Sequence, residues 1–136
     1  MGNEQTLMSN EKVVIKSRSL PPPGGPYSPA IKAGGFIFVS GQAAVDPQTG
    51  QVAGSTIEEQ TERTLENVKT IVTAAGASLD DVVRVTVYLA EITNFSRMNE
   101  VYKRYFSHDP PARTTLEARL AKPELLVEID AVAYKL

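Results

Sequence analysis

The sequence contains no cysteine and only one histidine, His108, among its 136 residues. The absence of cysteine excludes disulfides, thiolate nucleophiles and cysteine-ligated zinc sites. Because no second histidine and no serine motif accompany His108, a catalytic triad or a metal site there is not indicated, and we expect a solvated loop residue. Any chemistry of this chain therefore depends on other side chains.

The sequence also lacks long apolar runs and a strong excess of either charge. No run approaches the roughly 20 apolar residues of a membrane span. The 14 Lys and Arg residues against 16 Asp and Glu residues give a net charge of −2, so no basic surface for general nucleic-acid binding is indicated. We expect an ordinary globular protein with one domain.

The N-terminal residues show neither the apolar core of a signal peptide nor the Arg-rich character of a transit peptide, so we expect a cytoplasmic protein. Met1–Thr6 matches the N-myristoylation pattern through Gly2. No basic cluster follows to supply the second signal that stable anchoring needs. We therefore predict a flexible leader over residues 1–11 and a single domain over residues 12–136.

Apolar periodicity and turn residues predict the order β-β-β-α-β-α-β-β. The predicted strands are residues 12–16, 30–33, 36–40, 82–89, 114–120 and 125–134. The first helix begins at a capping box over Ser55–Glu58 and stops at Gly76, and Asn94 caps the second helix. Two long helices suffice to cover one face of a mixed sheet, so the predicted fold is α+β with both helices on one face.

The phases of the strands predict which residues face the helices. The apolar residues assigned to the helix-covered face are Val83, Val85, Val87, Leu89, Leu116, Ala118, Leu120, Val127, Ile129, Ala131 and Ala133. Arg113 and Glu128 are assigned to the opposite face. Phe36–Val39 is apolar on both faces, which is typical of a strand that is buried on both sides. We therefore expect the helix-free face to be a subunit interface in an oligomer.

Arg113 and Glu128 are the strongest functional candidates. Arg113 lies where a proline-held loop meets a strand, and a guanidinium can bind a small carboxylate through two parallel hydrogen bonds. Glu128 could orient and activate a water, for which partial burial would have to raise its pKa. The alternative is a pair of ordinary surface charges.

A tight turn near Lys122 and Pro123 would place Glu128 opposite Glu117 in a hairpin. Glu128 would then lie roughly 15 Å from Arg113 along the sheet. One subunit would not bring the two side chains together, whereas a site shared between neighbouring subunits could.

Four further residues have both a structural and a functional interpretation. Tyr27 follows a Pro- and Gly-rich loop and either packs or contacts a ligand. Ser40 and Gly41 end a buried strand, where the glycine permits a backbone bend or the close approach of a ligand. Asn99, at the rim of the apolar stripe of the second helix, either satisfies a local backbone group or belongs to a site.

These residues lie within a series of motifs that resembles the Rid family (reactive intermediate deaminase, also called the YjgF family). The motifs, in order, are Gly25–Ser28, Phe36–Gln42, Asp46–Gly50, Gln60, Thr64–Val68, Ala75–Gly76, Phe95, Asn99, Pro111–Arg113 and Val127–Ile129. The resemblance extends from about residue 12 to the end of the chain. The arginine followed by the later glutamate points to the RidA branch.

The resemblance implies a chorismate-mutase-like homotrimer with three clefts between subunits. It implies hydrolysis of 2-iminobutanoate, 2-iminopropanoate and their enamine tautomers to 2-oxo acids and ammonia. These reactive intermediates arise from PLP-dependent dehydratases, and the family enzyme itself needs no cofactor.

Carried over residue by residue, the resemblance makes Arg113 the carboxylate-binding residue and Glu128 the water-orienting residue. Tyr27, Ser40, Gly41, Asn99 and Thr115 match positions that line the cleft. Thr115 stands where many members carry a cysteine, so thiol-based reactivity is not expected. Residues 120–124 depart from the usual Leu-Pro-Lys turn of the family.

Two other functions remain open from the sequence. Family members have also been described as ribonucleases or inhibitors of translation, although the acidic pI of about 5.4 argues against an RNA-directed protein here. A non-catalytic small-molecule-binding or chaperone-like trimer would use the same cleft, and only turnover distinguishes it from an enzyme.

Overall fold

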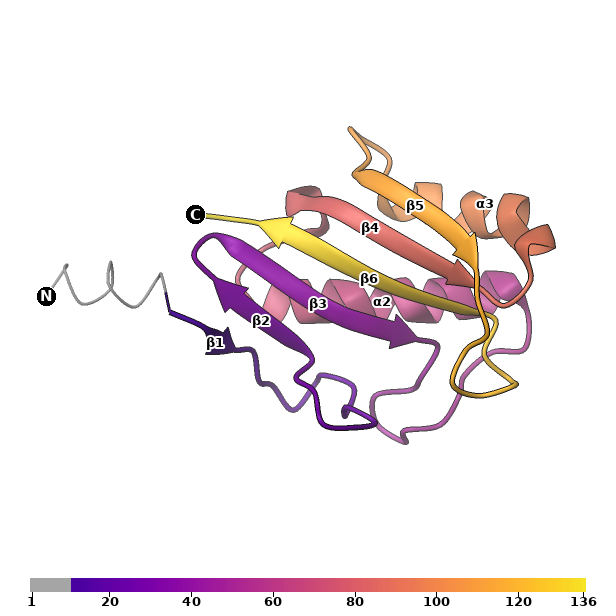
Figure 1. Ribbon diagram of the computed structural model, residues 1–136, viewed down its shortest axis with the longest axis horizontal. Coiled ribbons are helices and arrows are strands. Elements are labelled where there is room, and N and C mark those ends of the chain that lie inside the picture. Colours follow the sequence, from indigo (N-terminus) through magenta and orange to yellow (C-terminus); the bar gives the residue numbers. More distant parts are fainter. Residues whose placement is uncertain (1–10) are drawn as a thin grey trace, which may run out of the picture.

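Residues 11–136, the part of the chain that the computed structural model describes, form a mixed β-sheet with two α-helices on one side (Figure 1). The strands are β1 (Val13–Val14), β2 (Ala30–Ala33), β3 (Phe36–Ala43), β4 (Val82–Leu89), β5 (Ala112–Glu117) and β6 (Val127–Tyr134). The helices are α2 (Ile57–Ala74) and α3 (Phe95–Tyr105), with 3₁₀ turns η1 (Leu79–Asp81) and η2 (Ile92–Asn94). The predicted α+β class, with both helices on one face, is confirmed.

The predictions for Gly2 and for nearly all of the leader lie outside the described residues. Within the described part of the chain, no helix is both long and apolar enough to cross a membrane. The first predicted strand, residues 12–16, is shortened to the two residues of β1 at the sheet edge.

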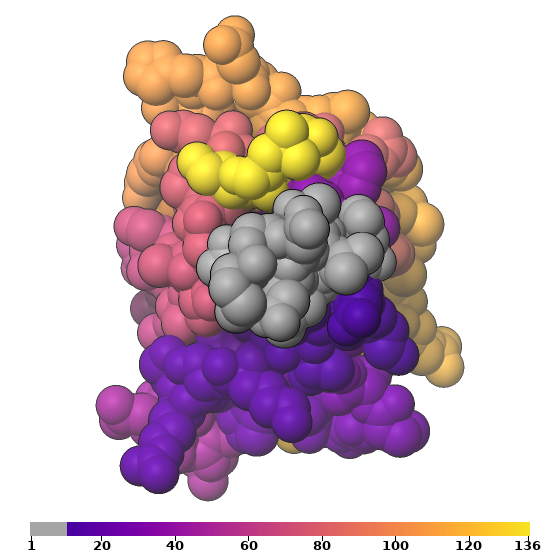
Figure 2. All heavy atoms as spheres, turned by 90° about the vertical axis from the view of Figure 1, so that its left-hand side faces the viewer, coloured from indigo at the N-terminus to yellow at the C-terminus, as the bar shows by residue number. Residues whose placement is uncertain are grey.

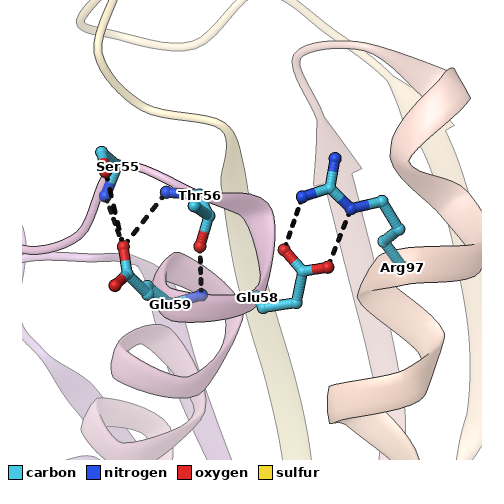
Figure 3. Close-up of polar contacts among 5 residues, drawn as sticks. All are labelled: Ser55, Thr56, Glu58, Glu59 and Arg97. Carbon is cyan, nitrogen blue, oxygen red and sulfur yellow. Dashed lines mark hydrogen bonds and ion pairs between the residues drawn. The ribbon is translucent and has the colours of Figure 1, made fainter.

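Helix α2 begins one residue later than predicted. Thr56 is the N-cap and accepts a hydrogen bond from the Glu59 backbone N at 3.1 Å, while Glu59 Oε1 accepts from the backbone N of Thr56 and of Ser55 (Figure 3). The sequence offers two overlapping capping boxes. Glu58, which the predicted box would use, instead binds Arg97 of α3 through two hydrogen bonds of 2.7 and 2.8 Å (Figure 3).

Helix α2 ends at Ala74, and Gly76, two residues later, provides the predicted stop. Gly76 has a φ of +88°, the left-handed conformation that glycine adopts readily. Its N–H binds the Thr73 carbonyl, and the N–H of Ala77 binds the Val72 carbonyl, both at 3.0 Å. These two bonds form a Schellman motif, which satisfies carbonyls that the helix end would leave unpaired.

The core lies between the sheet and the helices. Helix α2 contributes Leu65, Val68, Ile71 and Val72, all fully buried. The sheet contributes the buried residues Ile37, Val39, Val85, Val87, Leu89, Val127, Ile129, Ala131 and Ala133. The predicted inward positions of β6 are thus confirmed, and this layer fixes which side chains of the sheet point away from the helices.

The pairing of the last two strands differs from the predicted hairpin. The sheet order is β1-β2-β3-β6-β4-β5, so β4 lies between β5 and β6. Strand β5 runs parallel to β4 and is joined to it through α3, as in other parallel β-α-β units. Residues 118–126 then return to the antiparallel position of β6 between β3 and β4.

Four residues assigned to the helix-covered face lie elsewhere, and two of them, Ala118 and Leu120, lie beyond the end of β5. The β4–β6 register shifts between Val82 and Arg84, so that Val82 is buried while Val83 is 47% exposed. In β5, which spans residues 112–117 rather than 114–120, Leu116 is 39% exposed. The alternation of apolar residues misplaced Leu116 because β5 is an edge strand whose inward positions carry polar side chains.

Arg113 is also on the other face from the one predicted. It pairs with the buried Val85 of β4, and paired residues in neighbouring strands point to the same side of a sheet. Arg113 therefore faces the helix layer, whereas Glu128, paired with Tyr88, faces away from it. The prediction that Arg113 and Glu128 share the helix-free face is wrong.

The helix-free face carries a cluster of exposed aromatic side chains. Phe36, Phe38 and Tyr134 are each between 41% and 48% exposed, and the Phe36 and Tyr134 ring centroids lie 4.9 Å apart. The C-terminal residues are held beside this cluster by a hydrogen bond of 2.7 Å from Lys135 N to the Gly35 carbonyl. Figure 2 shows these C-terminal residues, in yellow, at this end of the molecule. The subunit interface on this face stays a prediction.

Candidate functional site

Glu128 lies on the helix-free face of β6, between Ala43 of β3 and Tyr88 of β4. The register of β3 shifts between Val39 and Gln42, which places Gly41 in an irregular segment beside Glu128. A Cβ at Gly41 would collide with Glu128 Oε2. The absence of a Cβ at Gly41 therefore permits the close approach of the Glu128 carboxylate.

The environment of Glu128 suits a proton carrier. Burial raises the pKa of the Glu128 carboxyl, and the negative charge of Asp130 raises it further. Among residues 11–136, no side chain or backbone group donates a hydrogen bond to this carboxylate. A raised pKa and the absence of a fixed donor both favour the protonated form of this carboxyl over that of an exposed glutamate.

Tyr27 and Ser40 lie close to Glu128 in the fold. Ser40 Oγ donates to the Ser28 carbonyl at 2.6 Å, which fixes the Tyr27 segment against β3. Tyr27 is 50% exposed, and its hydroxyl accepts a hydrogen bond from Gly24 N at 3.0 Å. Tyr27 and Glu128 line one pocket of about 210 Å³, together with Gly41 and Lys122. This Glu128 pocket has the size for a ligand of a few heavy atoms.

Arg113 projects from β5 toward α3, where two aromatic rings hold its guanidinium. The guanidinium carbon lies 4.6 Å from the Tyr102 ring centroid and 5.6 Å from the Phe95 ring centroid. Both distances are within the range of a cation–π interaction. Within residues 11–136 the ion pairs are Arg97–Glu58 and Lys103–Glu100, so no carboxylate of this part of the chain neutralises Arg113.

A second pocket borders this guanidinium. The Arg113 pocket is lined by Asn99 and Tyr102 of α3, by Pro110 and Pro111, and by Arg113. The side chain of Asn99 makes no hydrogen bond within the described part of the chain, which leaves its amide available to a ligand and disfavours the local structural role. A guanidinium without an ion-pair partner, next to an amide and to apolar side chains, is suited to binding a small carboxylate.

Buried hydroxyl groups accompany Arg113 on the helix-facing side. Thr115 Oγ1 and Tyr102 Oη are both buried without a hydrogen-bond partner among residues 11–136. Burial raises the pKa of the Tyr102 hydroxyl, and the nearby Arg113 guanidinium opposes that effect. The guanidinium thus lies close to this hydroxyl but is not aligned with it as a hydrogen bond. Thr115 shares the face of Arg113 but lines neither pocket, so its place in the site stays a prediction.

The two pockets are separate within one chain. Arg113 pairs with Val85 and Glu128 with Tyr88, so they are three residues apart along β4 and one strand on either side of it. Sheet geometry gives roughly 10 Å along the strand and about 10 Å across it. Because the two residues also face opposite sides of the sheet, Arg113 and Glu128 do not form one site within a single chain.

His108, the single histidine, is exposed in the loop before β5. Within residues 11–136, no three His, Asp or Glu side chains are grouped closely enough to hold a metal ion. The solvated loop residue that the sequence predicted is confirmed.

Comparison with known proteins identifies the family. A family model described as Endoribonuclease L-PSP matches residues 17–135. A RutC family protein from Pyrococcus abyssi is 51% identical over 124 residues, which cover 91% of this chain and 98% of the relative. Reactive Intermediate Deaminase A, a chloroplastic protein of Arabidopsis thaliana, is 37% identical, with 92% of this chain and 67% of the relative covered.

The chain belongs to the Rid family. Among solved structures, E. coli TdcF with bound serine superposes with a TM-score of 0.85 at 36% identity, covering 91% of this chain and 99% of that chain. The family resemblance drawn from the sequence motifs is therefore confirmed across nearly the whole domain.

Tyr102 contacts Arg113 and lines the Arg113 pocket of this Rid protein, and the sequence did not single it out as a candidate. Its place in the apolar stripe of α3 indicated a core residue, and it is indeed buried. Its contact with Arg113 depends on β5 being parallel to β4, because that connection lays α3 over β5. Phe95 and Tyr102 are seven residues apart, which places both on one helix face, and this spacing is the signal that could have identified them as a pair.

Proposed function

We propose that this protein is a RidA-type deaminase that hydrolyses 2-imino acids, such as 2-iminobutanoate and 2-iminopropanoate, to 2-oxo acids and ammonia. The observation that carries the proposal is the Arg113 guanidinium, held between two aromatic rings at the edge of a pocket and paired with no carboxylate of residues 11–136. The name of the Arabidopsis relative and the serine bound in TdcF support a small substrate with a carboxylate group.

Arg113 would bind the substrate carboxylate and so fix the position of C2. A charge-assisted hydrogen bond of this kind contributes roughly 1.5–3 kcal/mol. The Tyr102 and Phe95 rings restrict the orientation of the Arg113 guanidinium before the substrate binds, which lowers the entropic cost of binding.

Glu128 would carry the protons of the hydrolysis. It accepts a proton from a water whose oxygen bonds to C2, and the electrons of the C=N bond move to nitrogen, which takes up a proton. The carbinolamine then loses its C–N bond: the hydroxyl proton passes through Glu128 to the nitrogen, ammonia departs and C=O forms. Water is the only co-reactant, and the raised pKa of Glu128 suits both the acceptance and the return of the proton.

The complete site would be a cleft between two protomers of a homotrimer. One protomer supplies the Arg113 pocket with Asn99, and its neighbour supplies the Glu128 pocket with Tyr27 and Gly41. The two pockets on opposite faces of one sheet support this arrangement, because a second copy can bring unlike faces together. The exposed aromatic cluster of the helix-free face supplies apolar area for such an interface.

The direct test follows the disappearance of freshly generated 2-iminobutanoate with and without the protein. We expect acceleration by the wild type and loss of turnover in Arg113→Ala. Arg104→Ala is the matched control, because Arg104 is exposed on α3 and outside both pockets, and it should retain activity. Near-normal turnover by Arg113→Ala would refute the assignment.

Glu128→Gln separates binding from proton transfer. We expect a lower rate with largely unchanged binding of 2-oxobutanoate, since Arg113 is intact. Equal loss of both would make Glu128 a binding residue. A wild type that binds 2-oxobutanoate but does not accelerate imine loss would instead indicate a non-catalytic binding protein.

A further inference from the structure

Three polar side chains form a cluster on the helix-free face beside the Glu128 pocket. Tyr88 of β4 pairs with Glu128 of β6, and its hydroxyl donates a hydrogen bond of 2.8 Å to Asp130 Oδ2. Glu128 and Asp130 are two residues apart on one strand, so they share a face at a spacing of roughly 7 Å. We call Tyr88, Glu128 and Asp130 the acidic triad.

The neighbours of Glu128 leave Asp130 as the nearest negative charge. Strand β3 contributes only Gly41 and Ala43 beside Glu128, and neither side chain titrates. Strand β4 contributes the Tyr88 phenol. The surrounding loops contribute Tyr27 and Lys122, which line the same pocket.

The two carboxylates of the acidic triad differ in their hydrogen bonding. Asp130 is held by the Tyr88 hydroxyl, whereas the Glu128 carboxylate receives no hydrogen bond from residues 11–136. The bond to Asp130, with partial burial, raises the pKa of Tyr88, so the phenol keeps the proton that it donates. Two nearby carboxyls on a half-buried face resist being charged together, so the charge of Asp130 disfavours the charged form of Glu128.

We propose that Asp130, fixed in place by Tyr88, is a positioning residue whose negative charge favours the protonated form of the Glu128 carboxyl. Asp130 thereby keeps Glu128 able to exchange a proton under the conditions of turnover. The inference rests on the proposed acid–base function of Glu128. Its geometric basis is the register of β4 and β6 together with the Tyr88–Asp130 bond, and the charge of Asp130 is also among the causes that raise the pKa of Glu128.

The test is Asp130→Asn, which removes the charge but retains an oxygen that can accept the Tyr88 hydrogen bond. The pKa of Glu128 should fall, so the acidic limb of kcat/KM against pH should move to lower pH. At a fixed pH on that limb, the variant should retain at least about threefold more of its own maximal kcat/KM than the wild type. Coulomb's law gives about this factor for a unit charge roughly 7 Å away at the dielectric constant of water, so it is the smallest effect expected on this half-buried face.

Asp80→Asn is the matched control, because it makes the same chemical change in η1, next to the opposite end of β6. Its acidic limb should not move. A residue that only supports the fold would change the maximal rate or the melting temperature without displacing the limb. An acidic limb in Asp130→Asn that coincides with that of the wild type would overturn the inference.

A second measurement does not depend on activity. In protein labelled with ¹³C at the glutamate carboxyl carbons, the Glu128 signal is assigned by its loss in Glu128→Gln and then titrated in wild type and Asp130→Asn. A Glu128 midpoint at lower pH in Asp130→Asn supports the inference even if the wild type fails to hydrolyse imines, which would refute only the proposed function. An unchanged midpoint refutes the inference even if the deaminase activity is present.

Discussion

At the scale of single residues, Arg113 shows how a half-buried charge can be prepared for a ligand. Its guanidinium is stacked against Tyr102 and lies near Phe95, while its hydrogen-bonding edge lacks any protein carboxylate within residues 11–136. The identity of this residue as a candidate could be predicted, because a guanidinium after a rigid proline loop is suited to binding carboxylates. The face of the sheet on which Arg113 lies could not be predicted, because β5 is an edge strand whose inward positions carry polar side chains.

The aromatic contact predicts different results for two substitutions of Tyr102. Tyr102→Phe keeps the ring and removes a buried hydroxyl without a partner, so binding of 2-oxobutanoate and stability should both be retained. Tyr102→Leu removes the ring and should weaken binding by roughly two- to thirtyfold, the range of a cation–π contact of about 0.5–2 kcal/mol. Isothermal titration calorimetry measures both. Equal affinities in the two variants would show that the ring does not hold Arg113.

Gly41 gives a second prediction at this scale. Gly41→Ala adds a Cβ that collides with Glu128 Oε2, so the carboxylate must move and imine turnover should fall at least about tenfold. Gly24→Ala is the control in the same pocket, because its Cβ would meet its nearest neighbour at 3.7 Å, an ordinary contact. If both variants turned over substrate at the wild-type rate, the placement of Glu128 over Gly41 would not matter to catalysis.

At the scale of elements, α2 organises the loops around the Glu128 pocket through buried polar side chains. Gln60, 1% exposed, donates to the carbonyls of Gly54 and Glu124 and accepts from Leu126 N, with distances from 2.8 to 3.1 Å. Asn67 donates to the Ala43 and Val45 carbonyls. These bonds connect one helix to the end of β3 and to the chain that enters β6.

Gln60→Leu should therefore destabilise the fold strongly. It leaves three backbone groups without their partner, and each buried group costs about 1–3 kcal/mol, so the free energy of unfolding should fall by about 3 kcal/mol or more. Gln48→Leu, at an exposed position, should change it by less than about 0.5 kcal/mol. Urea denaturation of both variants decides the point. A small loss in Gln60→Leu would mean that water replaces the lost bonds.

The elements themselves were largely predictable, and their pairing was not. The helices of residues 57–74 and 95–105 follow from capping residues and apolar periodicity, which are local signals. The position of β6 between β3 and β4 depends on contacts far apart in the sequence. A hairpin with a short turn near Pro123 and a longer return past β4 would give the same pattern of apolar residues in the last two strands, so the pattern does not distinguish them. The irregular segments at Val83 and Gly41 also change which residues of β4 and β3 face the helices. The apolar periodicity alone does not show where such a change occurs.

At the scale of the whole molecule, the proposed site depends on contacts between copies of the chain. The need for a shared site was predicted from the distance between Arg113 and Glu128. The structure supports that hypothesis by a different route, since the two residues belong to separate pockets on opposite faces. No sequence signal specifies how the faces of two copies align, because that depends on the complementarity of folded surfaces.

Mixing two inactive variants tests the shared site. Arg113→Ala and Glu128→Gln should each be nearly inactive, but co-refolded in equal amounts they should regain about one quarter of wild-type turnover. Each cleft then draws an intact Arg113 from one protomer and an intact Glu128 from the other, each with a probability of about one half. Mixtures that stay as inactive as their components, although size-exclusion chromatography shows mixed assemblies, would place both residues in one protomer.

The placement of the anion-binding and proton-carrying groups on opposite sides of a single sheet has a consequence for regulation by abundance. If each chain contributes one half of the proposed site to each of two clefts, dilution below the dissociation constant of the assembly separates the halves. Turnover is then lost while every chain stays folded. Specific activity would then rise with protein concentration until the assembly saturates, and synthesis of the chain would switch the reaction on more steeply than in proportion to its amount.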